Sequence, residues 1–338
     1  GGSGPLTVGK LVRLQFHACF MGCNGFVGDV DGNRGIKEDD LPTLRDLYTN
    51  SYASAMSKAD FYAAASNMAL IKAQAIAEQH SPTPRAQLPP DELSVKFYHG
   101  RTDLDDQTLH HSGSAISLPS GHGDLGHITE FFQDAFGFSN TEVVAIMGAH
   151  TLGRARTANS GFRGRWVGRD HALDNQYFKD LLERGWRQVP VDQDCTSGDT
   201  CKFQWVRTVN NADGTPATMG QNGQNVMMLN ADVAIVDAPS YNADGSVSAQ
   251  CSVGTITTPQ GGVVANPTPA ACGDAPAEYR GKAEEYAGDN VAWLVDFSGA
   301  WDKLSTNGYG AGDLTEVVWT APPYEDTLRR VGVVCPTV

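Results

Sequence analysis

The stretch Val143–Arg156, reading V-V-A-I-M-G-A-H-T-L-G-R-A-R, is the part of the sequence that decides the fold. Ser139 and Glu142, just before this stretch, have the spacing of a capping box, which marks the beginning of a helix. The residues that follow are apolar, so the pattern predicts a buried helix. That helix carries one histidine, His150, near its far end.

Two residues with almost no side chain, Gly148 and Ala149, come directly before His150. We expect them to leave room for a flat, bulky group against the backbone. A histidine presented in this way is suited to be the axial ligand of a haem iron. The alternative is a hydrogen-bonded core histidine, which is the more common role of a lone histidine on an apolar helix. Residues elsewhere in the chain are needed to distinguish a haem ligand from a core histidine.

Composition and charge limit the classes of protein that the chain can belong to. It has 338 residues, 41% of them hydrophobic, and a net charge of −14. No apolar run reaches the roughly 18 residues of a membrane span, so we expect a soluble protein with a large core or two lobes. The acidic balance argues against a nucleic-acid partner. The chain begins at Gly1 with no apolar leader, so we expect a leader to have been removed or the start to be an artefact.

Seven cysteines suggest local disulfides. Three close pairs, with Cys335 left over, are Cys19 with Cys23, Cys195 with Cys201 and Cys251 with Cys272. Local pairs within loops favour an oxidising compartment, so we expect a secreted, extracellular protein. The alternative is a set of unrelated thiols in a cytosolic protein, and the lack of an N-glycosylation sequon weakens the case for secretion slightly.

Helical patterns dominate the rest of the chain, and strand signals are few, so the predicted class is mainly α. A polar hairpin is expected around Asn211–Gly214, and a surface insertion over 242–276. Trp293, Phe297 and Trp301, at four-residue spacing, are interpreted as core packing in preference to a redox chain. The predicted helices are 11–20, 37–48, 61–79 after a capping box at 57–60, 128–136, 141–147, 175–184 and 278–304.

Two motifs together resemble the plant, fungal and bacterial haem peroxidase superfamily. Leu11–Phe20, L-V-R-L-Q-F-H-A-C-F, is similar to its distal helix, and Gly148–Gly153, G-A-H-T-L-G, to its proximal histidine motif. The resemblance covers about Lys10 to Gly308. It implies one mainly-α, two-lobed domain over 1–338, with haem b (iron protoporphyrin IX) between distal and proximal helices. The expected parts are a distal lobe (about 1–135), a proximal lobe (about 136–308) and a C-terminal tail (309–338).

The distal motif supplies the groups that peroxide cleavage needs. One base above the iron has to move a proton between the two peroxide oxygens, and His17 is the candidate. Arg13, one turn away, is the candidate to stabilise the charge on the leaving oxygen. Asn33, in an Asn-x-Gly-Ile segment that resembles the Asn-x-Gly-Leu motif of the family, would hold His17 neutral through its side-chain carbonyl. A turn-forming role is the alternative for Asn33.

The proximal side departs from the secreted branches of the family. Asp232, in M-M-L-N-A-D, resembles the carboxylate that accepts a proton from the axial histidine, His150; an exposed Asp at a helix start is the alternative. Trp166 resembles the proximal Trp of the intracellular branch that includes cytochrome c peroxidase. We expect it either to store an oxidising equivalent or to pack beneath the haem.

The distal side resembles the secreted branches. Phe16 stands where the intracellular branch has Trp, and Cys19 with Cys23 resembles the short disulfide loop of secreted plant peroxidases. The chain therefore combines a secreted-type distal side with a proximal side similar to cytochrome c peroxidase. A metal site made by His17, Cys19 and Cys23 is a competing interpretation, although the C-x₂-C spacing and a fourth ligand are missing.

Other positions argue against the cations and special donors of the family. Thr151 and Asp174 match ligands of a proximal cation, but Val167 and Arg169 replace other ligands of that site. On the distal side, Ala18 and Asn24 replace ligands of Ca²⁺. Bound Ca²⁺ or K⁺ is therefore not favoured. Asn159 replaces the Arg that ascorbate peroxidases use. No acidic triad for Mn²⁺ lies around Leu6 and Lys10.

The predicted function is the reduction of hydrogen peroxide to water with one-electron oxidation of a small phenolic donor. The alternative is a peroxidase-fold structural or assembly component of an extracellular complex with little turnover. A third hypothesis is a protein electron donor that docks on the acidic surface and uses Trp166. No nucleic acid or membrane partner is expected, and Cys335 is the candidate for an interchain bond.

Overall fold

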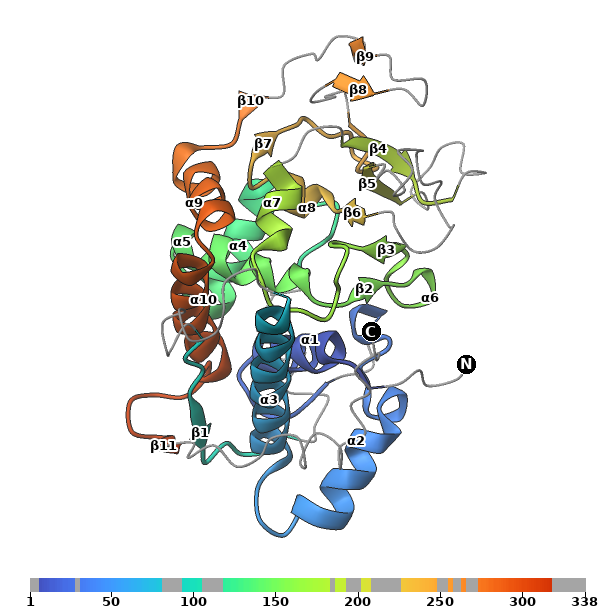
Figure 1. The fold of residues 1–338 in the computed structure, drawn as a ribbon. Coiled ribbons are helices and arrows are strands. Elements are labelled where there is room, and N and C mark those ends of the chain that lie inside the picture. Colours follow the sequence, from blue (N-terminus) through green and yellow to red (C-terminus); the bar gives the residue numbers. More distant parts are fainter. Residues whose placement is uncertain are drawn as a thin grey trace.

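The computed structural model describes residues 6–27, 31–80, 93–104, 118–182, 186–192, 202–207, 226–247, 255–257, 263–265 and 273–317. These residues form a mainly helical protein, as the sequence predicts (Figure 1). Among them, no helix has both the length and the apolar character of a membrane span. The division into distal and proximal lobes stays a prediction.

Helices α1 (Val8–Cys19) and α3 (Lys58–Gln79) lie side by side in the lower half of Figure 1. Each starts with a capping side chain, because Thr7 accepts from the amide of Lys10 and Ser57 accepts from the amide of Asp60. Helix α3 is rich in buried alanine. There Ser66 donates a 2.7 Å hydrogen bond to the carbonyl of Leu11, which ties the two backbones together.

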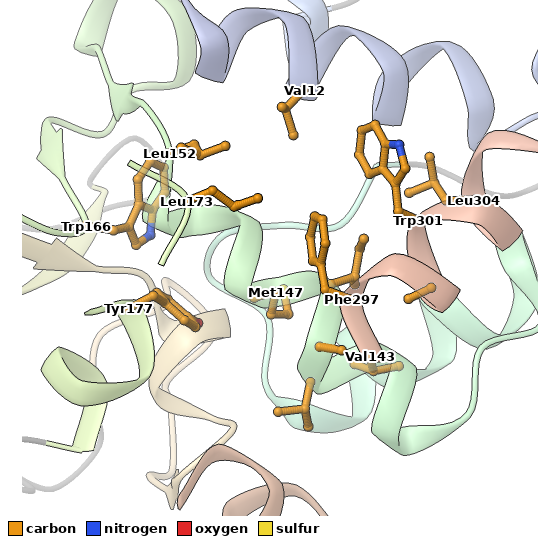
Figure 2. Packing of buried hydrophobic residues seen from close by; sticks show 14 of the residues in the cluster. Val12, Val143, Met147, Leu152, Trp166, Leu173, Tyr177, Phe297, Trp301 and Leu304 are labelled. Atoms are coloured by element: carbon orange, nitrogen blue, oxygen red, sulfur yellow. The ribbon is translucent and has the colours of Figure 1, made fainter. Parts of the chain in front are cut away.

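Helices α4 (Leu125–Phe136), α5 (Asn140–Met147), α9 (Ala277–Gly288) and α10 (Asn290–Ser305) form the second helical group. The capping box predicted before α5 is present, with both reciprocal bonds between Ser139 and Glu142. Trp293 is fully buried on α10 and donates to the carbonyl of Ala145 at 3.0 Å, and Phe297 and Trp301 are buried beside it. The interpretation of this stripe as core packing is confirmed (Figure 2).

A five-stranded sheet supports the segment that follows α5. Its order is β2 (Arg154–Ala155), β3 (Gly164–Arg165), β6 (Val226–Met228), β5 (Phe203–Arg207), β4 (Arg187–Pro190). Only β3 and β6 are parallel, and they pair Arg165 with Val226. This pairing brings the residue after β3, Trp166, close to the short helix that follows β6.

The remaining described elements are short. They are the 3₁₀ helices η1 (Asp31–Asn33), η2 (Glu38–Asp40) and η5 (Gly148–Thr151); the π-helix η3 (Tyr48–Tyr52); the helices α2 (Pro42–Leu47), α6 (Thr157–Ser160), α7 (Gln176–Leu182) and α8 (Asn230–Val233); and the strands β1 (Phe97–His99), β7 (Asp237–Ala238), β8 (Thr255–Thr257), β9 (Val263–Ala265), β10 (Gly273–Asp274) and β11 (Thr315–Val317).

Several predictions fall outside the described residues. These are the turn of the predicted hairpin at 211–214, most of the insertion 242–276, and the cysteines at 195, 201, 251, 272 and 335. The two strands on either side of the hairpin position, β5 and β6, do pair antiparallel.

A buried ion pair fixes the start of α3 to the end of α10. Asp60 accepts from the guanidinium of Arg101 at 2.9 Å and from the amide of Gly100 at 2.8 Å. Arg101 in turn donates to the carbonyl of Ser305 at 2.6 Å. Each charged group therefore has several partners, as burial requires.

Candidate active site

The distal histidine is held by the asparagine that the sequence predicts. His17 Nδ1 lies 2.7 Å from Oδ1 of Asn33, on the 3₁₀ helix η1. An amide oxygen can only accept, so Nδ1 carries the proton and Nε2 is left as a free base. Burial, together with the nearby charge of Arg13, lowers the pKa of His17 to about 3. The imidazole is therefore neutral at physiological pH.

Arg13 is held by the same loop. Its guanidinium donates to the carbonyls of Gly32, at 2.5 Å, and Arg34, at 3.0 Å. Burial lowers its pKa to about 10, so it stays charged at neutral pH. The loop thus positions both distal groups, while the action of Arg13 on a leaving oxygen remains a prediction.

Phenylalanine rings pack around the distal histidine. Phe16 meets His17 edge to face at 5.3 Å, and its ring centroid lies 6.0 Å or less from those of Phe131, Phe132 and Phe136 on α4. Such spacings are those of ordinary aromatic packing. The distal side is therefore bounded by rings that resist oxidation.

The proximal group centres on a carboxylate. His150 Nδ1 lies 2.7 Å from Oδ1 of Asp232, and the indole of Trp166 donates to Oδ2 at 2.8 Å. The Trp166 ring also stacks on the imidazole, with centroids 4.3 Å apart. Asp232 is 0% exposed, so the alternative of an exposed residue at a helix start is wrong. The structure brings these three predicted residues together.

Tyr177 is a member of the proximal group that the sequence reasoning missed. It lies on α7 and donates its hydroxyl to Oδ1 of Asp232 at 2.8 Å. With the amide of Leu229 on Oδ2, Asp232 accepts four hydrogen bonds. Burial and the neighbouring carboxylate raise the pKa of Tyr177 well above its usual value, which keeps the phenol protonated. The sequence feature that could have pointed to such a residue is Asp232 itself, because a buried carboxylate needs more hydrogen-bond donors than one histidine.

Two sequence expectations about the His150 region need correction. The α-helix ends at Met147, and His150 lies on the 3₁₀ helix η5. Gly148 does not make room for a cofactor, because a Cβ there would lie 2.5 Å from the indole nitrogen of Trp293. Its small size is required by packing against α10. Ala149 is half-buried at the edge of the same core.

The predicted cation ligands and cysteines are also placed. Thr151 donates to Asp174 at 3.4 Å, so this pair is brought together, and a cation between them stays a prediction. Cys19 and Cys23 form a disulfide. They therefore offer no thiolate, and the competing interpretation of a metal site with His17 is wrong.

The proximal donor set fits a haem iron. His150 has Nδ1 committed to a carboxylate, which leaves Nε2 as the nitrogen that can bind a metal. Its side chain is 31% exposed although Asp232 behind it is fully buried. Within the described residues, no group forms a hydrogen bond with Nε2 of His150.

Comparisons with known proteins agree with this geometry. The family model described as "Peroxidase" matches residues 3–245. A protein of Pyricularia oryzae named "Putative heme-binding peroxidase" is 35% identical over 148 residues, which are 44% of this chain and 43% of the relative. One of the same name from Gibberella zeae is 42% identical over 100 residues, 29% of each chain. The mitochondrial cytochrome c peroxidase of Candida glabrata is 35% identical over 93 residues, 28% of this chain and 25% of the relative.

Each of these three matches spans less than half the length of the relative. The family model, in contrast, covers well over half of this chain and includes His17, His150 and Asp232. The chain belongs to the peroxidase family.

Proposed function

We propose that this protein is a haem peroxidase that reduces hydrogen peroxide to water and oxidises a small phenolic donor. The observation that carries the proposal is the contrast between its two histidines. His17 is bonded to a neutral amide, and His150 to a carboxylate, each through Nδ1. The first arrangement makes a neutral proton acceptor and the second an electron-rich metal ligand.

The residues that would hold the haem are His150, as the ligand of the iron through Nε2, and Asp232 and Trp166 behind it. Bound haem supplies the iron that binds peroxide and the electrons that cleave its O–O bond. The carboxylate of Asp232 keeps the proton of His150 on Nδ1, so that Nε2 stays available.

The chain's own groups handle the protons. His17, unprotonated at Nε2, accepts the proton of the peroxide oxygen that binds first, and then delivers it to the leaving oxygen as water forms. Asn33 keeps the ring in the tautomer that makes this possible. Arg13, held on the same loop, offers its charge to the leaving oxygen.

A small phenol is the proposed donor in preference to ascorbate or Mn²⁺, whose binding groups are missing from the sequence. Asn159, at the position of the ascorbate-binding Arg, is uncharged, and its side-chain amide packs against Gly35. Phe16 is only partly buried and is backed by the buried rings of Phe131 and Phe132, so its ring is the part of this cluster that can contact a phenol.

The Cys19–Cys23 disulfide supports a further part of the proposal, that the protein works in an oxidising, extracellular compartment.

Substitution His17→Leu tests the function. Loading with haem should give an absorption spectrum like that of the wild type, because His150 is intact. The rate of reaction with hydrogen peroxide should fall by about 10²–10⁴-fold, the usual contribution of a general acid–base group. His99→Leu, at an exposed position on β1, is the matched control and should react like the wild type.

An unchanged rate in His17→Leu would refute the role of His17. Wild-type protein that binds haem but oxidises no phenol would instead support a structural or assembly role.

A further inference from the structure

Aromatic rings form a continuous path from the proximal site to helix α9. The ring of Tyr177 lies 6.0 Å from that of His150 and 5.0 Å from that of Phe178. Phe178 in turn lies 5.2 Å from the ring of Tyr286 on α9. All three contacts are edge-to-face and within the range of direct aromatic packing. The path leads away from His150 toward the outside of the helical group.

A second branch runs along α10. Phe178 contacts Trp293 at 5.8 Å, and Trp293, Phe297 and Trp301 follow at 5.5 and 6.0 Å. Figure 2 shows Tyr177 and Trp166 on one side of Met147, and Phe297 and Trp301 on the other. Both Trp indoles on this branch donate to uncharged oxygens, those of Ala145 and Asn67.

The Tyr286 branch ends differently, on a carboxylate. The hydroxyl of Tyr286 donates to Oδ2 of Asp296 at 2.7 Å. The ring itself is buried, but the side chain of Asp296 is 34% exposed. Lys282 lies 3.4 Å from Asp296 and 5.4 Å from the centre of the Tyr286 ring, and it also pairs with Glu285. A buried phenol is thus connected to a base that reaches water.

This difference decides which ring along the two branches can hold a radical. A phenol that loses an electron becomes a strong acid, so the radical persists only if a base takes its proton. Asp296 is such a base, and its exposure allows the proton to exchange with solvent. Asp232, the partner of Tyr177, is fully buried and already shared among four donors. The α10 branch offers its indoles no carboxylate.

We propose that the Tyr286–Asp296 pair is a second site of one-electron oxidation, reached from the haem site through Tyr177 and Phe178. The proposal rests on the proposed function, which supplies hydrogen peroxide as the oxidant. Its substrates are one-electron donors too large to enter the haem pocket, which contact the surface around Asp296 and Lys282.

Hydrogen peroxide takes up two electrons and two protons and yields two molecules of water. Two donor molecules each supply one electron, one of them through Tyr286 and the other at the haem site, and the two protons come from solvent. One of these electrons comes from Tyr286, whose O–H bond breaks while the proton bonds to Oδ2 of Asp296, leaving a neutral phenoxyl radical. An external donor then returns one electron to Tyr286, and the proton returns from Asp296 to re-form the phenol.

The test uses the full chain loaded with haem and treated with one equivalent of hydrogen peroxide in the absence of donor. Rapid freezing and electron paramagnetic resonance, with ring-deuterated tyrosine, identify a tyrosyl radical. Trapping with 2-methyl-2-nitrosopropane, followed by peptide mass spectrometry, locates it. We expect a tyrosyl signal in the wild type and the trapped adduct on Tyr286.

Three variants and a matched control sharpen the test. Tyr286→Phe should lose the signal, and Asp296→Asn should lose most of it although the phenol remains. Asp296→Glu, which restores a carboxylate, should recover it. Tyr279→Phe makes the same change on the same helix, where the hydroxyl instead accepts from Thr129, and should keep the wild-type signal. Oxidation of a small phenol should be unchanged in Tyr286→Phe.

The outcomes separate this inference from the proposed function. A wild type that consumes peroxide without a tyrosyl signal, or a Tyr286→Phe variant that keeps the signal, overturns the inference and leaves the peroxidase intact. A protein that binds haem and does not consume peroxide refutes the proposed function and removes the oxidant on which the inference depends.

Discussion

Replacing Tyr177 by Phe should make the reduction potential of the bound haem iron more negative. The Tyr177 hydroxyl and His150 Nδ1 share one oxygen, Oδ1 of Asp232. The hydroxyl withdraws charge from that oxygen, and its removal leaves the carboxylate a stronger acceptor for the imidazole proton. His150 then becomes a better electron donor, which favours ferric over ferrous iron.

The size of the shift follows from the four bonds on Asp232. A hydrogen bond to a charged group contributes about 1.5–3 kcal/mol. If the lost bond changes the free-energy difference between ferric and ferrous haem by about 1 kcal/mol, the reduction potential falls by about 40 mV. For one electron, a tenfold change in the equilibrium constant corresponds to about 59 mV. The free energy of unfolding should fall by only about 1 kcal/mol, because Oδ1 keeps its bond to His150.

Spectroelectrochemical titration of the haem-loaded protein measures this shift. Tyr279→Phe, which removes a hydroxyl bonded to Thr129, is the control and should leave the potential where it is. A Tyr177→Phe variant that folds, binds haem and has an unchanged or more positive potential would refute the idea that the hydroxyl competes with His150 for Asp232.

Four further outcomes are expected. Folding lowers the pKa of His17 to about 3, so between this pH and about pH 6.5 the unfolded chain binds more protons than the folded chain. The free energy of unfolding should therefore be highest above about pH 6.5 and should fall by up to about 1.4 kcal/mol per pH unit as the pH drops toward 3. Acid denaturation measures this fall. For the same reason, the rate with peroxide should be flat between about pH 5 and pH 8 in stopped-flow experiments, and a midpoint near the unperturbed histidine value would contradict it. Asp60→Asn, which breaks the buried pair with Arg101, should lower the free energy of unfolding by about 3–5 kcal/mol in urea, whereas Glu316→Gln, in the half-exposed pair with Lys96, should leave it nearly unchanged. Turnover of a small phenol should vary little with ionic strength, and a strong salt dependence with a cationic protein donor would favour docking on the acidic surface.

Much of the site could be predicted because its residues lie in short motifs. His17 and Asn33, and His150 with Asp232 and Trp166, were each expected as partners, and the structure places each set within hydrogen-bond distance. The start of α5 was predictable for the same reason, since a capping box is a local pattern.

What could not be predicted depends on contacts between distant segments. The hydroxyl of Tyr177 meets a carboxylate 55 positions later, and a helical pattern shows only that the ring is buried. The reason for Gly148 was misjudged because Trp293, which requires its small size, comes from α10. The predicted range 141–147 ends where α5 ends, but His150 was wrongly placed on that helix, because side-chain periodicity does not reveal the 3₁₀ turn that follows Met147.

The four bonds on Asp232 also have a consequence for how the protein folds. The donors come from η5, the segment after β3, α7 and the turn before α8. A carboxylate loses its hydration without a large penalty only when such donors are in place, so a partial set leaves it solvated. We therefore expect these four segments to assemble together, and the amide of Leu229 to exchange its hydrogen with solvent only when all of them open.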